Sequence, residues 1–228
     1  MSRELTLPDR QALDDLETFL GRARRVDPDG AARLVVTGGM LAVYVSPVHG
    51  GGGPTVLGLR VVALAPGPGP DACLDADQQG LDVTVALSAL LDRFPRLRSS
   101  SAPPVTLSLP PAPVAAAWAG VAPPRSGWDA VGLLGAARLR EAAASGIREI
   151  ADGVPAGTGA AAVARVRGLV WGRPLAEDLA DVPAGVAFAA DALAFLDDAE
   201  PVALYRLRPW VRATTSRGHV LARRPALL

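Results

Sequence analysis

The feature that most constrains the fold of this 228-residue chain is a change of hydrophobic period near residue 134. Before that point, residues 40–45 (MLAVYV) form a short β-rich run, and residues 81–87 (LDVTVAL) alternate between apolar and other residues with a period of two, which is typical of β-strands. After that point, apolar residues recur every three or four positions, as they do in helices. The pattern predicts an α+β fold with a β-rich region over 1–134 and a helical region over 135–228, packed as one compact unit.

The N-terminal half is expected to open with a helix and to continue as antiparallel strands. Leu13, Leu16 and Leu20 form one apolar stripe, which predicts an amphipathic helix over residues 8–25 that begins near Thr6. A Gly38-Gly39 pair supplies the positive φ angles that a tight hairpin needs. The runs before and after this pair are therefore expected to form a β-hairpin, and a third strand is expected over residues 55–65.

The order strand, helix, strand, strand, strand occurs twice in this interpretation. It begins near Glu4 and again near Leu81, and the second copy would end with strands over 114–118 and 128–134. Such a two-fold βαβββ order resembles the repeated unit of sliding-clamp domains. The resemblance concerns the fold alone, because the same fold can support unrelated functions.

The C-terminal half is expected to contain three helices and to close with a β-hairpin. The first helix is expected from residue 135 onward, with a stripe of Leu139, Ala143, Ile147 and Ile150 and an end near Gly153, and the other two are predicted over about 158–170 and 183–196. The hairpin would join residues 203–211 to residues 218–223, and its arginines suit a sheet edge, where charge deters unwanted pairing.

The helix over 183–196 is unusual because it is apolar on every side. Such a helix must be covered on every side, since an exposed large apolar side chain forgoes about 1.5–3 kcal/mol of burial free energy. We therefore expect a homo-oligomer or a protein partner at this helix, with an interface formed by Val186, Phe188, Leu193 and Phe195.

Composition excludes several classes of protein. Cys73 is the only cysteine, so the chain cannot form an intrachain disulfide, and two histidines without metal-binding spacing predict no metal site. The beginning of the chain lacks the apolar core of a secretory signal, and no window has the roughly 20 apolar residues of a membrane helix. These observations predict a cytoplasmic protein that does not contact a membrane.

Two glycine-rich segments resemble catalytic or cofactor motifs but lack the required context. Residues 49–53 (HGGGG) resemble the oxyanion-hole segment of esterases, yet no serine lies on a GxSxG elbow. Residues 157–162 match a loose dinucleotide fingerprint, but a helix, not a strand, is predicted before them. We therefore predict no catalytic residue and no cofactor, and we interpret residues 49–53 as a mobile, dispensable loop.

Arginine and tryptophan mark the residues that are best suited to bind a ligand. Several tryptophans lie near arginines, which permits cation–π contacts and is typical of interfaces and of pockets for anions. The predicted ligand-binding set comprises Arg125, Trp128, Trp171, Arg173, Arg217 and His219.

Residues 202–228 contain six arginines and no carboxylate. Basic side chains interleaved with aromatic ones are typical of single-stranded nucleic-acid binding. The alternative nucleic-acid set comprises Arg206, Arg208, Trp210 and Arg212.

Three segments together resemble an uncharacterised family of high-GC Gram-positive (actinobacterial) bacteria. They are residues 113–128 (PVAAAWAGVAPPRSGW), 166–175 (VRGLVWGRPL) and 210–223 (WVRATTSRGHVLAR). The resemblance spans most of the chain and implies no known activity.

Three hypotheses for the function remain open. The missing catalytic set favours a non-catalytic scaffold or regulatory protein that acts through protein–protein contacts. An enzyme or small-anion binder with a Trp/Arg pocket is the first alternative. A nucleic-acid binder that uses the arginine-rich C-terminal hairpin is the second.

Overall fold

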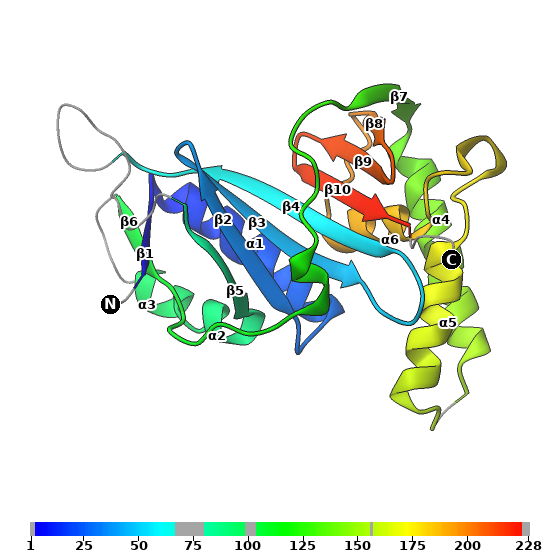
Figure 1. Ribbon diagram of the computed structural model, residues 1–228, viewed down its shortest axis with the longest axis horizontal. Helices are drawn as coiled ribbons and strands as arrows, with labels where there is room; N and C mark the ends of the chain where they lie inside the picture. The colour runs from blue at the N-terminus through cyan, green and yellow to red at the C-terminus, as the bar shows by residue number, and fades with distance from the viewer. Residues whose placement is uncertain (1–2, 67–79, 99–103, 156, 225–228) are drawn as a thin grey trace. The chain divides into compact units, whose positions relative to one another are not determined.

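The computed structural model describes residues 3–66, 80–98, 104–155 and 157–224 (Figure 1). Cys73 lies outside these residues. The fold is α+β with antiparallel sheet pairing, as the sequence predicts. The chain divides into two compact units: unit 1 comprises Met1–Val45 and Leu59–Gly120, and unit 2 comprises Ser46–Gly58 and Val121–Leu228. One long hairpin therefore contributes its base to unit 1 and its tip to unit 2.

Unit 1 contains an antiparallel sheet in the order β5-β2-β3-β4 and a separate β1–β6 pair. Its elements are β1 (Glu4–Leu7), α1 (Arg10–Val26), β2 (Ala31–Thr37), β3 (Met40–Val48), β4 (Thr55–Ala63), β5 (Asp82–Ala86), α2 (Leu87–Leu91), α3 (Phe94–Arg98), β6 (Val105–Ser108) and the 3-10 helix η1 (Ala117–Gly120).

Helix α1 forms where the leucine stripe predicts it. Its N-cap is Asp9, whose carboxylate accepts a hydrogen bond from the backbone N–H of Ala12 at 2.8 Å and so satisfies one of the free amides of the first turn. Leu13, Leu16 and Leu20 are fully buried. Burial of this stripe, and not the cap alone, holds the helix in unit 1, since each such leucine contributes about 1.5–3 kcal/mol.

The predicted hairpin of β2 and β3 is confirmed. Thr37 pairs with Met40, so Gly38 and Gly39 form a two-residue turn, and their φ angles are +56° and +78°. Both angles are positive, as the tightest hairpin turns require, and glycine adopts them without steric cost.

The predicted second βαβββ copy is wrong in its last part. Strands β5 and β6 and helix α2 form, but residues 114–118 are not a strand; they lead into η1 after a segment that contains Pro110, Pro111 and Pro113. Proline removes the N–H that a ladder needs, so this segment cannot continue the sheet. The strand predicted over 128–134 does form, but as part of unit 2.

Unit 2 contains a sheet in the order β4-β10-β9-β8-β7, with three helices beside it (Figure 1). Its elements are β7 (Asp129–Leu134), α4 (Ala136–Gly153), α5 (Ala160–Gly172), the 3-10 helix η2 (Glu177–Leu179), α6 (Gly185–Ala192), β8 (Val202–Leu207), β9 (Trp210–Thr215) and β10 (Gly218–Arg223). β7 pairs with β8, so residues 121–134 belong to unit 2, whereas the sequence placed them with the β-rich region.

The predicted C-terminal hairpin is in fact a three-stranded meander. Arg208 and Pro209 form a turn inside the run that had been interpreted as one strand, because Leu207 on β8 pairs with Trp210 on β9. The prediction that these strands lie at a sheet edge is also wrong. β10, β9 and β8 are each paired on both sides, and β7 is the edge strand of this unit.

The apolar sides of helix α6 are buried by other elements of unit 2. It packs against α4, α5 and β10. Of the four residues predicted to form an interface, Val186, Leu193 and Phe195 are buried, and Phe188 stacks on Trp171 with ring centroids 4.6 Å apart. The helix therefore no longer requires a partner to cover its apolar sides.

The glycine-rich loop at residues 49–53 packs against α5, which corrects its interpretation as a dispensable loop. A Cβ on Gly51, whose φ is +62°, would lie 2.3 Å from the carbonyl oxygen of Ala164. A Cβ on Gly53 would lie 2.6 Å from the Cα of Gly168. Real Cβ atoms do not approach backbone so closely, so these glycines allow the loop to contact the helix backbone.

Candidate functional site

The unit 2 sheet has two faces of different character. One face presents small aliphatic side chains from β8, β9 and β10 that are buried: Val202, Leu204, Val211, Ala213, Val220 and Ala222. α6 packs on β10. Because opposite residues in an antiparallel pair share a face, the cross-strand register defines the other face.

The second face is built from rows of directly opposite residues. One row runs Leu133, Ala203, Thr214, His219, and the next runs Ala130, Tyr205, Arg212, Leu221. Trp128, in the loop before β7, adds its ring to the second row. We call this surface the Arg212 face and define it by Trp128, Leu133, Tyr205, Arg212, Thr214 and His219.

Arg212 contacts two aromatic rings. Its guanidinium carbon is 4.8 Å from the ring centroid of Trp128 and 4.5 Å from that of Tyr205. The indole is fixed because Trp128 Nε1 donates a hydrogen bond to the carbonyl oxygen of Pro124 at 3.2 Å. Contact with two rings stabilises the cation by cation–π attraction, which is typically worth about 0.5–2 kcal/mol for each ring.

No carboxylate pairs with Arg212 among the residues that the structure describes. Its Nε atom is buried and has no hydrogen-bond acceptor. Burial lowers the pKa of Arg212, and the nearby Tyr205 acts in the opposite direction. A guanidinium that is partly desolvated and lacks an acceptor is a site at which an added anion would gain free energy.

His219 lies on β10 beside this cation. Its Nδ1 is 3.1 Å from Thr214 Oγ1, its direct cross-strand neighbour. Burial is the main cause that lowers the pKa of His219, and the positive charge of Arg212 lowers it further. The imidazole is therefore neutral at pH 7, and its pKa responds to the charge near Arg212.

The edge of the face exposes apolar side chains. Leu133 on β7 is 68% exposed, and Val131 on the same strand is 39% exposed. β7 is paired only with β8, and a bulge interrupts its register between Ala130 and Gly132. An exposed leucine beside a cluster of tryptophan, tyrosine and arginine has the composition of a protein interface.

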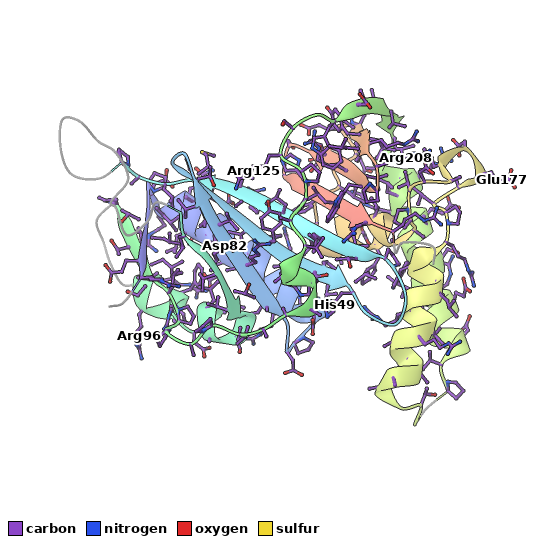
Figure 2. All side chains as sticks on the ribbon, in the orientation of Figure 1. His49, Asp82, Arg96, Arg125, Glu177 and Arg208 are labelled. Carbon is purple, nitrogen blue, oxygen red and sulfur yellow. The ribbon has the colours of Figure 1, made fainter. Side chains whose placement is uncertain are left out.

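The predicted ligand-binding set is divided by the structure. Trp128 and His219 lie on the Arg212 face, and Arg125 is exposed in the loop before Trp128 (Figure 2). Trp171 is instead buried in the helical layer, where it stacks on Phe188. Arg173 pairs with Glu149 at 2.7 Å and Arg217 with Asp197 at 2.5 Å, so each already has a carboxylate partner.

The predicted nucleic-acid set is also divided. Arg206 and Arg208 (Figure 2) both pair with Asp181, at 3.2 and 3.5 Å. Trp210 is only 5% exposed, which leaves little of its ring for a base to stack on. Arg212 is the one member of this set that belongs to the Arg212 face.

The described part of the chain also forms hollows away from this face. A pocket of about 400 Å³ in unit 2 lies between the glycine-rich loop and α5, lined by Pro54, Leu169 and Arg173 among others. An open groove of about 800 Å³ in unit 1 lies between α1 and α2, and Arg98 and Glu17 at its wall pair with each other. Neither presents a buried charge that lacks a partner, so the Arg212 face is the stronger site.

Among the described residues, no three His, Cys, Asp or Glu side chains form a group that could hold a metal ion. None of the helices in the described part of the chain combines the length and apolar character needed to cross a membrane.

Sequence reasoning missed Leu133, Tyr205 and Thr214 as members of one surface with Arg212. The sequence shows a period of two along β8 and along β9, which predicts which residues of each strand share a face with Tyr205 or with Arg212. What was missing was the turn at Arg208 and Pro209, because this turn sets the register that makes Tyr205 and Arg212 direct neighbours.

Comparison with known protein families divides the chain near residue 120, where the main segment of unit 1 also ends. Residues 1–120 match the model of a domain of unknown function (DUF8010), and residues 123–227 match that of a second domain of unknown function (DUF8185). A search of curated proteins finds no match to the chain.

Proposed function

The chain belongs to the family defined by the domain of unknown function DUF8010, and we propose that it is a cytoplasmic scaffold or regulatory protein that binds a protein partner through the Arg212 face. The observation that carries this proposal is the Arg212 cation, which contacts the rings of both Trp128 and Tyr205 on a face that also exposes a leucine. A single cysteine is consistent with a reducing compartment.

The chemistry of the face supports a protein partner. Tryptophan, tyrosine and arginine are the residues that most often dominate the free energy of protein association, because they bury large rigid surfaces and donate directed hydrogen bonds. The rings of Trp128 and Tyr205 already hold Arg212 in one place, so little side-chain entropy is lost when a partner docks. Leu133 adds an apolar contact at the rim.

A small-anion binder, including an enzyme that acts on an anionic substrate, is the second candidate. It is favoured by the buried Nε of Arg212, which has no acceptor, and by the neutral imidazole of His219 close by. Nucleic-acid binding is a weaker proposal, because Asp181 already neutralises much of the charge of Arg206 and Arg208. Phosphate contacts would have to compete with these ion pairs.

Replacement of Leu133 by serine tests the proposed function with little risk to the fold, since the side chain is 68% exposed. The tagged protein and its Leu133→Ser variant are incubated with extract of the cells that produce it, and the amount of each retained protein is quantified. We expect Leu133→Ser and Arg212→Gln each to reduce one specific retained protein by about 10-fold or more, as the loss of an interface anchor does.

The matched controls are Leu169→Ser and Arg165→Gln, which replace exposed residues of α5 away from the face. Leu169 is 61% exposed and thus comparable to Leu133. Equal loss in the control and face variants, or no loss in either, would contradict the proposal.

A further inference from the structure

The chemistry of the Arg212 face also identifies the group that it binds. Resting on the function proposed above, we infer that Arg212 receives a side-chain carboxylate from an acidic segment of the partner protein.

The face is cationic, and the register places no acidic residue of β7 to β10 on it, because Asp129 of β7 lies opposite Arg206 on the other face of the sheet. Besides the residues that define the face, the register places Arg223 on this side of the sheet, together with the buried Trp210 and Leu221. Two arginines and one histidine have no carboxylate among them. Charge complementarity therefore selects an anionic partner surface, and it would also accelerate association.

The geometry of Arg212 restricts how an anion can approach. The rings of Trp128 and Tyr205 lie within 4.8 and 4.5 Å of the guanidinium carbon and so occupy part of the space around the cation. An acceptor approaches in the plane of the group, where its N–H bonds point. A carboxylate fits this approach, because its two oxygens accept two parallel hydrogen bonds from one guanidinium.

A second copy of this chain is a poorer occupant of the face. A two-fold dimer brings the same patch of each subunit together, so Arg212 and Arg223 would meet a surface that has the same charges and no acidic residue. Like charges in a desolvated contact oppose association. A surface rich in aspartate or glutamate on another protein avoids this repulsion.

His219 provides a direct readout of this contact. The chain has only two histidines, so the imidazole signals of His219 and His49 can be assigned with one variant and followed separately by NMR. The charge of Arg212 contributes to the low pKa of His219, and a carboxylate paired with Arg212 would offset that charge. A glutamate-rich peptide added to the full chain should therefore raise the pKa of His219, and the His49 signal serves as the internal reference.

The controls separate the sources of an anion. A peptide in which every glutamate is glutamine should leave the pKa of His219 unchanged, and so should inorganic phosphate at the same concentration. Arg212→Gln should weaken binding of the acidic peptide by about 10-fold or more, whereas Arg165→Gln should not. The peptide should then no longer raise the pKa of His219 in the Arg212→Gln variant.

Two results would overturn the inference: no change in the pKa of His219 with the acidic peptide, or a rise with phosphate alone, which would indicate a small-anion site. Either result leaves the proposed function in place if the Leu133→Ser variant still retains less of the partner protein from extract than the unmodified chain does. If Leu133→Ser and Arg212→Gln both retain that partner, it is the proposed function that fails.

Discussion

Replacing Trp171 by alanine is expected to lower the free energy of unfolding of unit 2 by about 3–5 kcal/mol, the usual cost of removing a large buried aromatic side chain. Trp171 is 1% exposed and stacks on Phe188. A Cβ built on Gly146 of α4 would lie 2.3 Å from the Trp171 ring, and a Cβ built on Gly185 of α6 would lie 3.2 Å from the Cβ of Trp171. The indole therefore fills the space where three helices meet, and alanine would leave a cavity there.

Denaturant unfolding followed by circular dichroism measures this effect, and Leu169→Ala on the same helix is the control. Leu169 is 61% exposed, so its truncation should change the free energy of unfolding by less than about 0.5–1 kcal/mol. A loss of less than about 1 kcal/mol for Trp171→Ala would mean that the helices of unit 2 do not depend on this ring.

The second large effect is expected at Gly168, where α5 meets the glycine-rich loop. A Cβ at this position would lie 2.7 Å from the carbonyl oxygen of Gly51 and 3.1 Å from the amide nitrogen of Gly53. Backbone atoms cannot move aside as a flexible side chain can, so Gly168→Ala should cost about 1–3 kcal/mol of unfolding free energy. This predicted loss of stability has the opposite sign to the effect of helix propensity, because a Gly→Ala change in a helix would by itself stabilise the helix by about 1 kcal/mol.

Gly21→Ala in α1 isolates the propensity contribution. A Cβ at Gly21 would have no atom within 4 Å, so alanine there should stabilise unit 1 or leave it unchanged. If Gly168→Ala is as stable as the unmodified chain in the same unfolding measurement, the loop is not held against the helix and is the dispensable segment that its composition suggests.

Local signals in the sequence predicted the elements of unit 1 that depend on local chemistry. The leucine stripe of α1 and the Gly38-Gly39 turn each specify their own structure within a few residues. The βαβββ repeat failed because it needed strand formation over 114–118, where three nearby prolines remove ladder hydrogen bonds. The hydrophobic pattern predicted where several strands begin and end, but it did not predict which strands pair with each other.

The site illustrates the same limit. Trp128, Arg212 and His219 were each singled out by residue type, but in two separate sets, because their proximity depends on the pairing of β8, β9 and β10. Val186 and Phe195 were expected at an interface because the helix is apolar on all sides. Whether such a helix is covered by its own chain or by a partner is decided by tertiary packing, which the period of one segment does not contain.

Photo-crosslinking from the Arg212 face shows whether a partner protein docks there, because it reports contact with the partner itself. A photoreactive phenylalanine derivative is placed at Leu133 in one variant and at Leu169 in another, both exposed positions of unit 2. The account predicts one discrete adduct with an acidic protein from position 133 after irradiation in the native cells, and none from position 169. An adduct from position 169 alone, or the same adducts from both, would contradict it.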